Sequence, residues 1–202
     1  MAYASWVTPN KVSGSGNDTV AWTGSPHTGR EPRTTYAIFA ASNVENKTLT
    51  INQAGKPEYV SFDSATAAVD KTGGTLTITG KSNSSKLTFS LTGSNNIGLV
   101  LPSSYSANSV NTNNGAAIAG DPGAAQEYVF SITFTGIPEN TSISSLISQL
   151  TVTPNSGTAA TCEITQAAGD AYLTISPTTI NLTAAGTAVS VSVSSNTSWT
   201  VS

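Results

Sequence analysis

The chain has 202 residues, of which only 9% are charged, and its formal net charge is −3. An ordinary soluble domain has roughly 25% charged residues. A disordered chain combines high net charge with few β-branched residues, whereas Val, Ile and Thr recur throughout this sequence. The weak negative charge argues against nucleic acid as a partner, and the longest apolar cluster, residues 97–101, is too short to cross a bilayer.

The periodicity predicts an all-β fold. Apolar residues alternate with polar ones, and Asn, Gly and Pro clusters separate these segments at the spacing of a β-sandwich. Strands are predicted, in chain order, at 35–40, 48–51, 76–78, 128–134 and 188–193. One short helix is predicted over 141–150, because Ile143, Leu146, Ile147 and Leu150 lie at positions i, i+3, i+4 and i+7.

The sequence repeats itself at a distance of 113 residues. Ile51 and Gln53 fall on Ile164 and Gln166 in a register without gaps. The same shift aligns residues 59–83 with 172–196, and a shift of 112 aligns 20–26 with 132–138. Such a repeat indicates one structural unit present more than once.

The phase of the repeat predicts the domain organisation. The complete unit spans 57–168 and carries an insertion at about 90–113. Residues 1–55 correspond to its second half, and residues 169–202 to its first part. Joined, the two end segments have the length of a small sandwich. The predicted fold is therefore a row of immunoglobulin-like β-sandwich repeats, with one complete central domain between two complementary partial domains.

The end segments resemble a BACON domain, an immunoglobulin-like module found in proteins of gut Bacteroidetes and their phages. Residues 171–202, with Trp199, resemble its opening half. Trp6, the Ser-Gly-Ser-Gly-Asn turn at 13–17, Arg33 and the strand at 49–54 follow in the order of its closing half. The central unit resembles the module more faintly, because the register places Lys86 where Trp199 stands. The resemblance implies carbohydrate or mucin binding and a structural role for Arg33.

A half-sandwich leaves apolar faces and ladder groups unpaired, so each partial domain is expected to find a complement. The two halves would close within one chain, pair with a neighbouring copy, or continue in a longer natural chain. Pairing between copies is favoured, because the links near 56–57 and 169–170 are short and sandwich termini usually lie at opposite ends. Such a head-to-tail contact builds rings or fibres. The predicted assembly interface consists of Trp6, Val7, Val191, Val193, Trp199 and Val201.

The predicted function is structural assembly. The composition is typical of extracellular sandwiches, whereas residues 1–6 do not start a signal peptide. A phage virion protein, made in the host cytoplasm, combines both properties. The chain is therefore expected to be a capsid auxiliary or decoration protein, or a head or tail fibre subunit, with capsid proteins as partners. The alternative is a carbohydrate- or mucin-binding module of a larger cell-surface protein.

The residues do not suggest an enzyme. His27 is the only histidine, Cys162 is expected to be a buried apolar residue, and no spacing typical of metal ligands occurs, so no cofactor is expected. The best prospect for binding a partner is the insertion, because long loops in compact domains are often functional. The candidate contacts to a partner or glycan are Leu99, Leu101 and Tyr105 in the insertion, together with His27 and Arg30.

Overall fold

The computed structural model describes residues 3–119, 121 and 126–202, and within them the chain is all-β, as the periodicity predicts. The strands of the first fifty-odd residues are β1 (Val7–Pro9), β2 (Trp22–Gly24), β3 (Arg33–Phe39) and β4 (Lys47–Gln53). The middle of the chain forms β5 (Val60–Phe62), β6 (Thr66–Val69), β7 (Gly74–Ser82), β8 (Leu87–Thr92), β9 (Ser104–Ala107), β10 (Val110–Asn113), β11 (Tyr128–Ile137), β12 (Leu146–Pro154) and β13 (Ala160–Gln166). The last segment forms β14 (Leu173–Ser176) and β15 (Ser192–Ser195).

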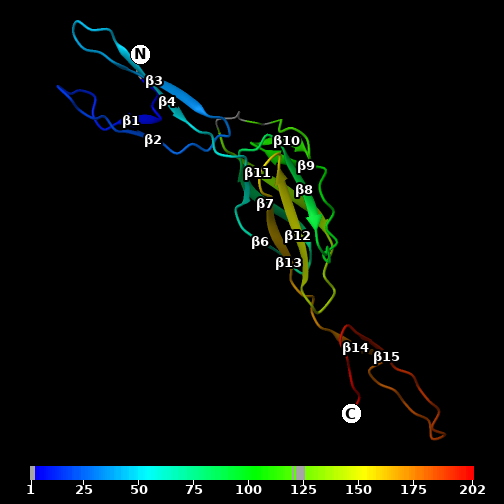
Figure 1. The fold of residues 1–202 in the computed structure, drawn as a ribbon. Helices are drawn as coiled ribbons and strands as arrows, with labels where there is room; N and C mark the ends of the chain where they lie inside the picture. Colours follow the sequence, from blue (N-terminus) through cyan, green and yellow to red (C-terminus); the bar gives the residue numbers. More distant parts are fainter. Residues whose placement is uncertain (1–2, 120, 122–125) are drawn as a thin grey trace.

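The molecule is elongated, with a central block between two smaller units (Figure 1). The central block, β5 to β13, consists of a five-stranded sheet in the order β10-β9-β11-β7-β5 and a four-stranded sheet in the order β6-β13-β12-β8. All neighbouring strands are antiparallel except β6 and β13, which run parallel. We call residues 1–55 the N-terminal unit and residues 170–202 the C-terminal unit. These two units lie at opposite ends of the central block (Figure 1).

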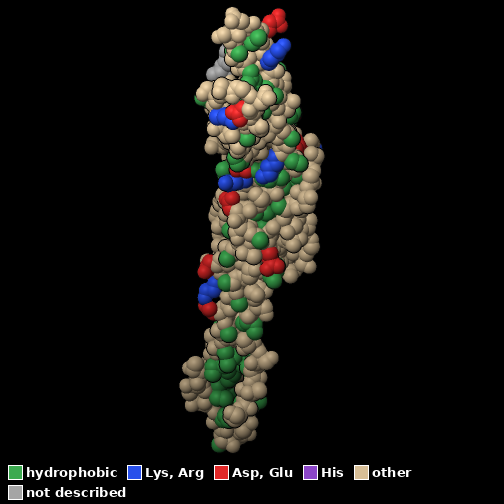
Figure 2. Space-filling model, turned by 60° about the vertical axis from the view of Figure 1, so that its left-hand side comes forward, with side chains coloured by type: hydrophobic (Ala, Val, Ile, Leu, Met, Phe, Trp, Pro, Cys, Tyr) green, Lys and Arg blue, Asp and Glu red, His purple; other side chains and the backbone are tan. Residues whose placement is uncertain are grey.

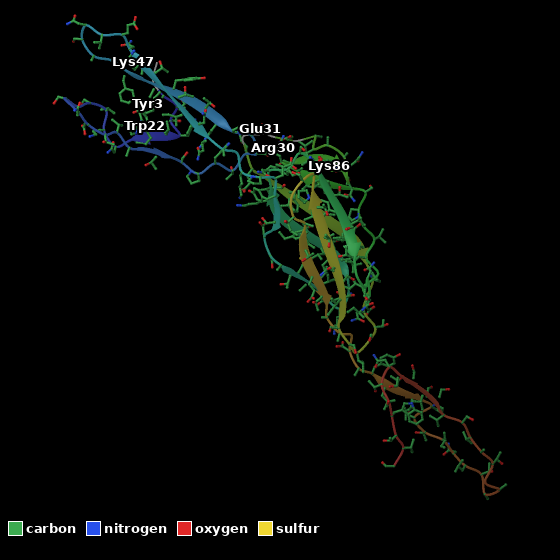
Figure 3. All side chains as sticks on the ribbon, viewed as in Figure 1. Tyr3, Trp22, Arg30, Glu31, Lys47 and Lys86 are labelled. Carbon is green, nitrogen blue, oxygen red and sulfur yellow. The ribbon has the colours of Figure 1, made fainter. Side chains whose placement is uncertain are left out.

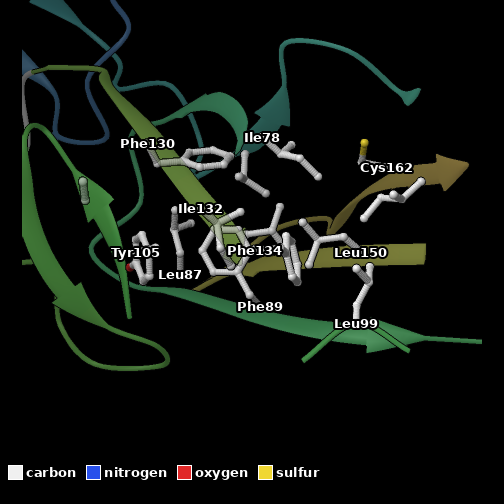
Figure 4. Packing of buried hydrophobic residues seen from close by; sticks show 14 of the residues in the cluster. Ile78, Leu87, Phe89, Leu99, Tyr105, Phe130, Ile132, Phe134, Leu150 and Cys162 are labelled. Atoms are coloured by element: carbon white, nitrogen blue, oxygen red, sulfur yellow. The ribbon is translucent and has the colours of Figure 1, made fainter. Parts of the chain in front are cut away.

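One hydrophobic core fills the central block, and residues of both sheets contribute to it (Figure 4). On β11, Phe130, Ile132 and Phe134 point inward, whereas Val129, the residue before Phe130, is exposed. The Phe89 ring of the opposite sheet meets Phe130 edge to face, with 5.6 Å between the ring centroids. Each such buried side chain contributes about 1.5–3 kcal/mol relative to exposure. The alternation seen in the sequence is therefore the alternation between core and solvent.

The helix predicted over 141–150 is wrong, because β12 begins at Leu146 and pairs with both β8 and β13. Ser148 and Leu150 are buried on one face of this strand, whereas Ile147 points to solvent. The apolar residues therefore satisfied the helical spacing by coincidence. Two neighbouring strands supply the hydrogen bonds of this backbone, and this tertiary pairing overrides a weak local preference.

The strands predicted at 35–40, 48–51, 76–78 and 128–134 coincide with β3, β4, β7 and β11. The strand predicted at 188–193 is only partly formed, because β15 begins at Ser192. In the central block, the corresponding strand β7 is held on both sides, by β5 and β11. In the C-terminal unit β15 is paired with β14 alone, and residues 188–191, which precede β15, have no ladder partner among the described strands.

Candidate assembly interface

The N-terminal unit consists of two hairpin-like pairs, β1 with β2 and β3 with β4, and an open groove lies between them. The groove has a volume of about 510 Å³, and its lining includes Val20, Trp22, Ile38 and Phe39. Trp22 and Tyr3 meet inside the unit with 5.2 Å between ring centroids (Figure 3). Trp22 also contacts Phe39 edge to face at 6.5 Å. The groove therefore joins this aromatic cluster to polar residues such as Lys11 and Asp18, and it is open to solvent.

The C-terminal unit exposes an apolar surface of its own. Figure 2 shows hydrophobic side chains gathered on one face of this unit, at the lower end of the molecule. Its exposed large hydrophobic residues are Tyr172, Leu173, Ile175, Ile180, Leu182, Val189, Val191, Trp199 and Val201. Monomeric soluble proteins rarely expose contiguous apolar patches of this kind unless the patch contacts a partner.

The two pairs of strands at the chain ends have the same registers as pairs within the central block. In the β3–β4 pair, Arg33 lies opposite Gln53, and in the β12–β13 pair, Leu146 lies opposite Gln166. Each position differs by the same 113 residues. In the C-terminal unit β14 pairs with β15, and a shift of 113 turns this register into that of β5 with β7. Segments aligned by the repeat thus have equivalent pairing.

The central block contains neighbours that the end units lack. There, β13 lies beside β6, β12 lies beside β8, and β7 and β11 lie beside each other. In the N-terminal unit β3 and β4 form a two-stranded sheet, and β2 pairs only with β1 among the described residues. In the C-terminal unit β15 pairs only with β14 in the described chain. The open edges therefore occur where the central block places a neighbouring strand.

Residues at equivalent positions differ in burial accordingly. Val191 of the C-terminal unit is 37% exposed, whereas Ile78, its equivalent on β7, is 5% exposed. Leu182 is 62% exposed, whereas its equivalent Val69 is 6% exposed. On β3, Phe39 is exposed while its equivalent in β12 is fully buried. These differences identify the surfaces that the end units leave uncovered.

Among the residues predicted for the interface, Val191, Trp199 and Val201 are exposed and Val193 is half-buried in the C-terminal unit. Val7, also predicted for the interface, is buried within the N-terminal unit and presents no uncovered surface there. Its strand β1 pairs with β2 and so covers it locally.

Arg33 organises the N-terminal unit around Trp6. Its guanidinium group lies 4.5 Å from the centre of the Trp6 ring, so Trp6 is half-buried. Arg33 Nε donates to Gln53 Oε1 at 2.9 Å, and its Nη2 donates to the carbonyl oxygen of Ser25 at 2.8 Å. The side-chain amide of Gln53 donates to the same carbonyl oxygen at 2.9 Å. Arg33 therefore ties β3, β4 and the end of β2 together without help from another copy.

The insertion does not present the contacts predicted for it. Leu99 and Tyr105 are buried in the central core, and Leu101 is packed against it. Burial raises the pKa of Tyr105 to about 12, because its phenol is removed from water. The insertion forms β9 and β10, which extend the five-stranded sheet and bury Tyr105 and Ala107, whereas Val100 and Val110 stay exposed. Its contribution is to the central core.

His27 and Arg30 lie where the N-terminal unit joins the central block (Figure 3 labels Arg30). The His27 ring donates through Nε2 to the carbonyl oxygen of Glu31 at 2.8 Å. Arg30 Nη2 lies 2.6 Å from Asp121 Oδ2, and its Nη1 donates to the carbonyl oxygen of Asn83 at 2.8 Å. The hydrogen bond and ion pair with Asp121 hold the pKa of Arg30 above its usual value, although its partial burial acts in the opposite direction. Both side chains make intramolecular contacts at the junction.

Cys162 is buried, and burial raises the pKa of its thiol, which keeps it protonated and unreactive. Within residues 3–119, 121 and 126–202, no group of three His, Cys, Asp or Glu side chains is placed to hold a metal ion. The same part of the chain contains no helix long and apolar enough to cross a membrane.

Neither a scan against protein-family models nor a search of curated proteins finds a match to this chain.

Proposed function

We propose that the protein is a non-enzymatic structural protein that assembles head to tail. The C-terminal unit of one copy docks on the N-terminal unit of another, and together they form a second immunoglobulin-like sandwich. The observation that carries this proposal is the match between the strands that one end unit lacks and the strands that the other supplies. Strand complementation between chains is an established mode of protein recognition.

The C-terminal unit offers three segments for this docking. A shift of 113 makes residues 179–182 equivalent to β6, and β15 with the residues before it equivalent to β7. In the central block β6 covers the edge of β13, and β7 covers the edge of β11. The equivalent edges in the N-terminal unit, those of β4 and β2, are open. Two of the missing neighbours thus have counterparts in the C-terminal unit.

The third segment is residues 199–202, the counterpart of β8. On β8 the side chains of Leu87 and Phe89 point into the core. The same alternation in the C-terminal unit is made by Trp199 and Val201, at a shift of 112 rather than 113. Aligning the inward faces, rather than Lys86 with Trp199, therefore gives both large apolar residues a place in the new core.

The registers of the central block serve as the template for the proposed contacts between copies. Ile132 lies opposite Ile78 in the central block. In the proposed docking, Val20 of one copy takes the place of Ile132 and Val191 of the next takes that of Ile78. Val152 lies opposite Phe89, and in the proposed docking Phe39 and Val201 take these two positions. Each contact joins apolar side chains, and the residues taken from the C-terminal unit are exposed in a single chain. Burial of this apolar area is the driving force for docking.

The second part of the proposal concerns where the assembly operates. The resemblance to the BACON-type module, which occurs in phages of gut Bacteroidetes, favours a virion component that decorates the capsid or forms a head or tail fibre. Other virion proteins, such as a capsid protein, would then be its partners. Electron microscopy of virions labelled with an antibody to this chain tests this part separately.

A cysteine cross-link between full-length chains tests the docking. Opposed residues of an antiparallel pair have Cα atoms about 4.5–5.5 Å apart, within the range that a disulfide bridges. We expect a mixture of the Val20→Cys and Val191→Cys variants to form a disulfide-linked dimer under mild oxidation, and neither variant alone to do so. The native Cys162 is buried and stays out of the reaction.

The matched control is Ser190→Cys, because neighbouring residues of a strand point to opposite faces. This variant should not cross-link to Val20→Cys. If the Val20→Cys and Val191→Cys mixture stays monomeric on non-reducing gels, or if Ser190→Cys links equally well, the proposed docking is wrong.

A further inference from the structure

The junction between the N-terminal unit and the central block is held by Asn83. Its side-chain amide donates to the carbonyl oxygens of Thr28 at 3.0 Å and Pro57 at 3.3 Å. Its Oδ1 accepts a hydrogen bond of 2.9 Å from the backbone N–H of Tyr59. Thr28 belongs to the N-terminal unit and Asn83 follows β7 of the central block, so this one buried side chain fixes the two against each other.

The junction between the central block and the C-terminal unit is held in the same way by Asn196. Its side-chain amide donates to the carbonyl oxygens of Thr141 at 3.3 Å and Asp170 at 2.8 Å. Its Oδ1 accepts from the backbone N–H of Tyr172 at 2.9 Å. Every one of these residues lies 113 positions after its counterpart at the first junction.

A backbone hydrogen bond repeats as well. The N–H of Lys56 donates to the carbonyl oxygen of Gly29 at 2.8 Å, and the N–H of Gly169 donates to that of Ser142 at 2.7 Å. Both donor and acceptor are again shifted by 113. The link before the central block and the link after it are therefore held by the same backbone hydrogen bond. The step from one unit to the next has equivalent contacts at both junctions.

From these contacts we infer that the assembly is an open, straight-running filament in which every sandwich follows the previous one by the same step. The inference rests on the proposed docking of end units. The chain enters the central block at one end and leaves it at the other (Figure 1). A composite sandwich built in the same way has the central block of one copy at one end and that of the next copy at the other.

This geometry separates a filament from a closed dimer. Two copies that exchanged end units reciprocally would need both central blocks on the same side of each composite sandwich. The entry and exit at opposite ends forbid this arrangement. A heterologous contact that does not close on itself propagates into a filament.

Because the two junctions are equivalent, the axial repeat of the filament is shorter than the axial length that one copy adds. Each copy contributes one complete sandwich and two halves, so two nearly equal steps make up one subunit. Strands of nine residues, such as β7 and β12, span about 30 Å at ~3.3 Å per residue. We expect a dominant axial repeat of roughly 30–40 Å, one sandwich with its link, and a weaker repeat at twice this spacing.

Sedimentation velocity and negative-stain electron microscopy of the full chain test the inference. We expect a mass distribution that broadens and moves upward with concentration without reaching a plateau, and filaments with the short axial repeat. A single species of fixed mass, whether dimer or ring, would overturn the filament while leaving the docking of end units intact. Monomers at every concentration would overturn both.

A chain-stopping variant gives an independent readout. Val191→Asp damages the docking face of the C-terminal unit but leaves the N-terminal unit able to accept one neighbour. Added in equal amount, it should shorten the filaments severalfold. The matched control is Val129→Asp, at an exposed valine of β11 in the central block, which should leave the length unchanged. Filaments insensitive to Val191→Asp would show that they are built by a different contact.

Discussion

Trp199 is the residue whose removal should weaken assembly most clearly. In a single chain 49% of its surface is exposed, whereas Leu87, its counterpart in the central block, is 0% exposed. Docking should therefore bury about half of the ~150–250 Å² that a Trp side chain contributes, or roughly 75–125 Å². At ~25 cal/mol per Å² of apolar area, Trp199→Ala should lose about 2–3 kcal/mol of docking free energy.

This loss corresponds to a dissociation constant raised by roughly 30- to 150-fold. Analytical ultracentrifugation over a wide concentration range measures it as a shift of the association midpoint. Thermal unfolding followed by circular dichroism shows that the central block is unaffected, because Trp199 lies outside its core. Val129→Ala serves as the control, since this exposed valine of the central block should change neither quantity.

Two results would refute the reasoning about Trp199. The first is an association midpoint for Trp199→Ala equal to that of the unchanged protein, which would mean that Trp199 stays in water after assembly. The second is a large fall in the unfolding temperature of the central block, which would mean that Trp199 supports that block rather than the contact between copies.

Ile78→Asp should unfold the central block, because it puts an unpaired charge in the core at a cost of several kcal/mol. Val191→Asp, at the equivalent position of the C-terminal unit, should instead abolish assembly and leave the unfolding temperature of the central block unchanged. Burial alone would raise the pKa of Glu58, but hydrogen bonds from residues such as Ser156 hold this pKa below its usual 4.5. The ionised Glu58 carboxylate therefore stabilises the fold fully above about pH 4.5, and this stabilisation is lost as the pH falls through the lower folded pKa. In melting curves recorded from pH 3 to 7, Glu58→Gln should reduce the fall of the unfolding temperature at acid pH. An unchanged fall would contradict this role of Glu58. Arg33→Ala should loosen the N-terminal unit by about 1–3 kcal/mol, through its lost hydrogen bonds and contact with an aromatic ring. Hydrogen exchange should then quicken in residues 1–55 and stay unchanged in the central block; equal quickening in both would contradict a local role.

Much of the fold could be predicted because its signals are local or periodic. Alternation along β7 and β11 identifies them as strands, since one face of each must meet the core. Alignment of Gln53 with Gln166 depends on sequence identity alone, and the pairs β3–β4 and β12–β13 have the register that this alignment implies. The helix over 141–150 failed because spacing alone does not distinguish two apolar faces of a strand from one stripe of a helix.

Some of the predicted site residues are exposed as expected, and others are buried. The exposure of Val191, Trp199 and Val201 followed from their place in an incomplete unit, and the structure leaves all three uncovered. Leu99 and Tyr105 were misplaced, because a long insertion was expected to be a surface loop and instead adds two strands to a sheet. A stronger signal was available in their apolar character, which favours burial.

The amino-acid sequence by itself determined the all-β class, the 113-residue repeat and the phase at which the repeat stands in this chain, since these depend only on residue types and their order. Only the tertiary structure decided where the insertion goes, which edges of β2, β4 and β15 stay open, and that Asn83 and Asn196 make the same contacts at both junctions. These properties depend on which distant segments meet, and side-chain periodicity along one strand carries no information about the strand beside it.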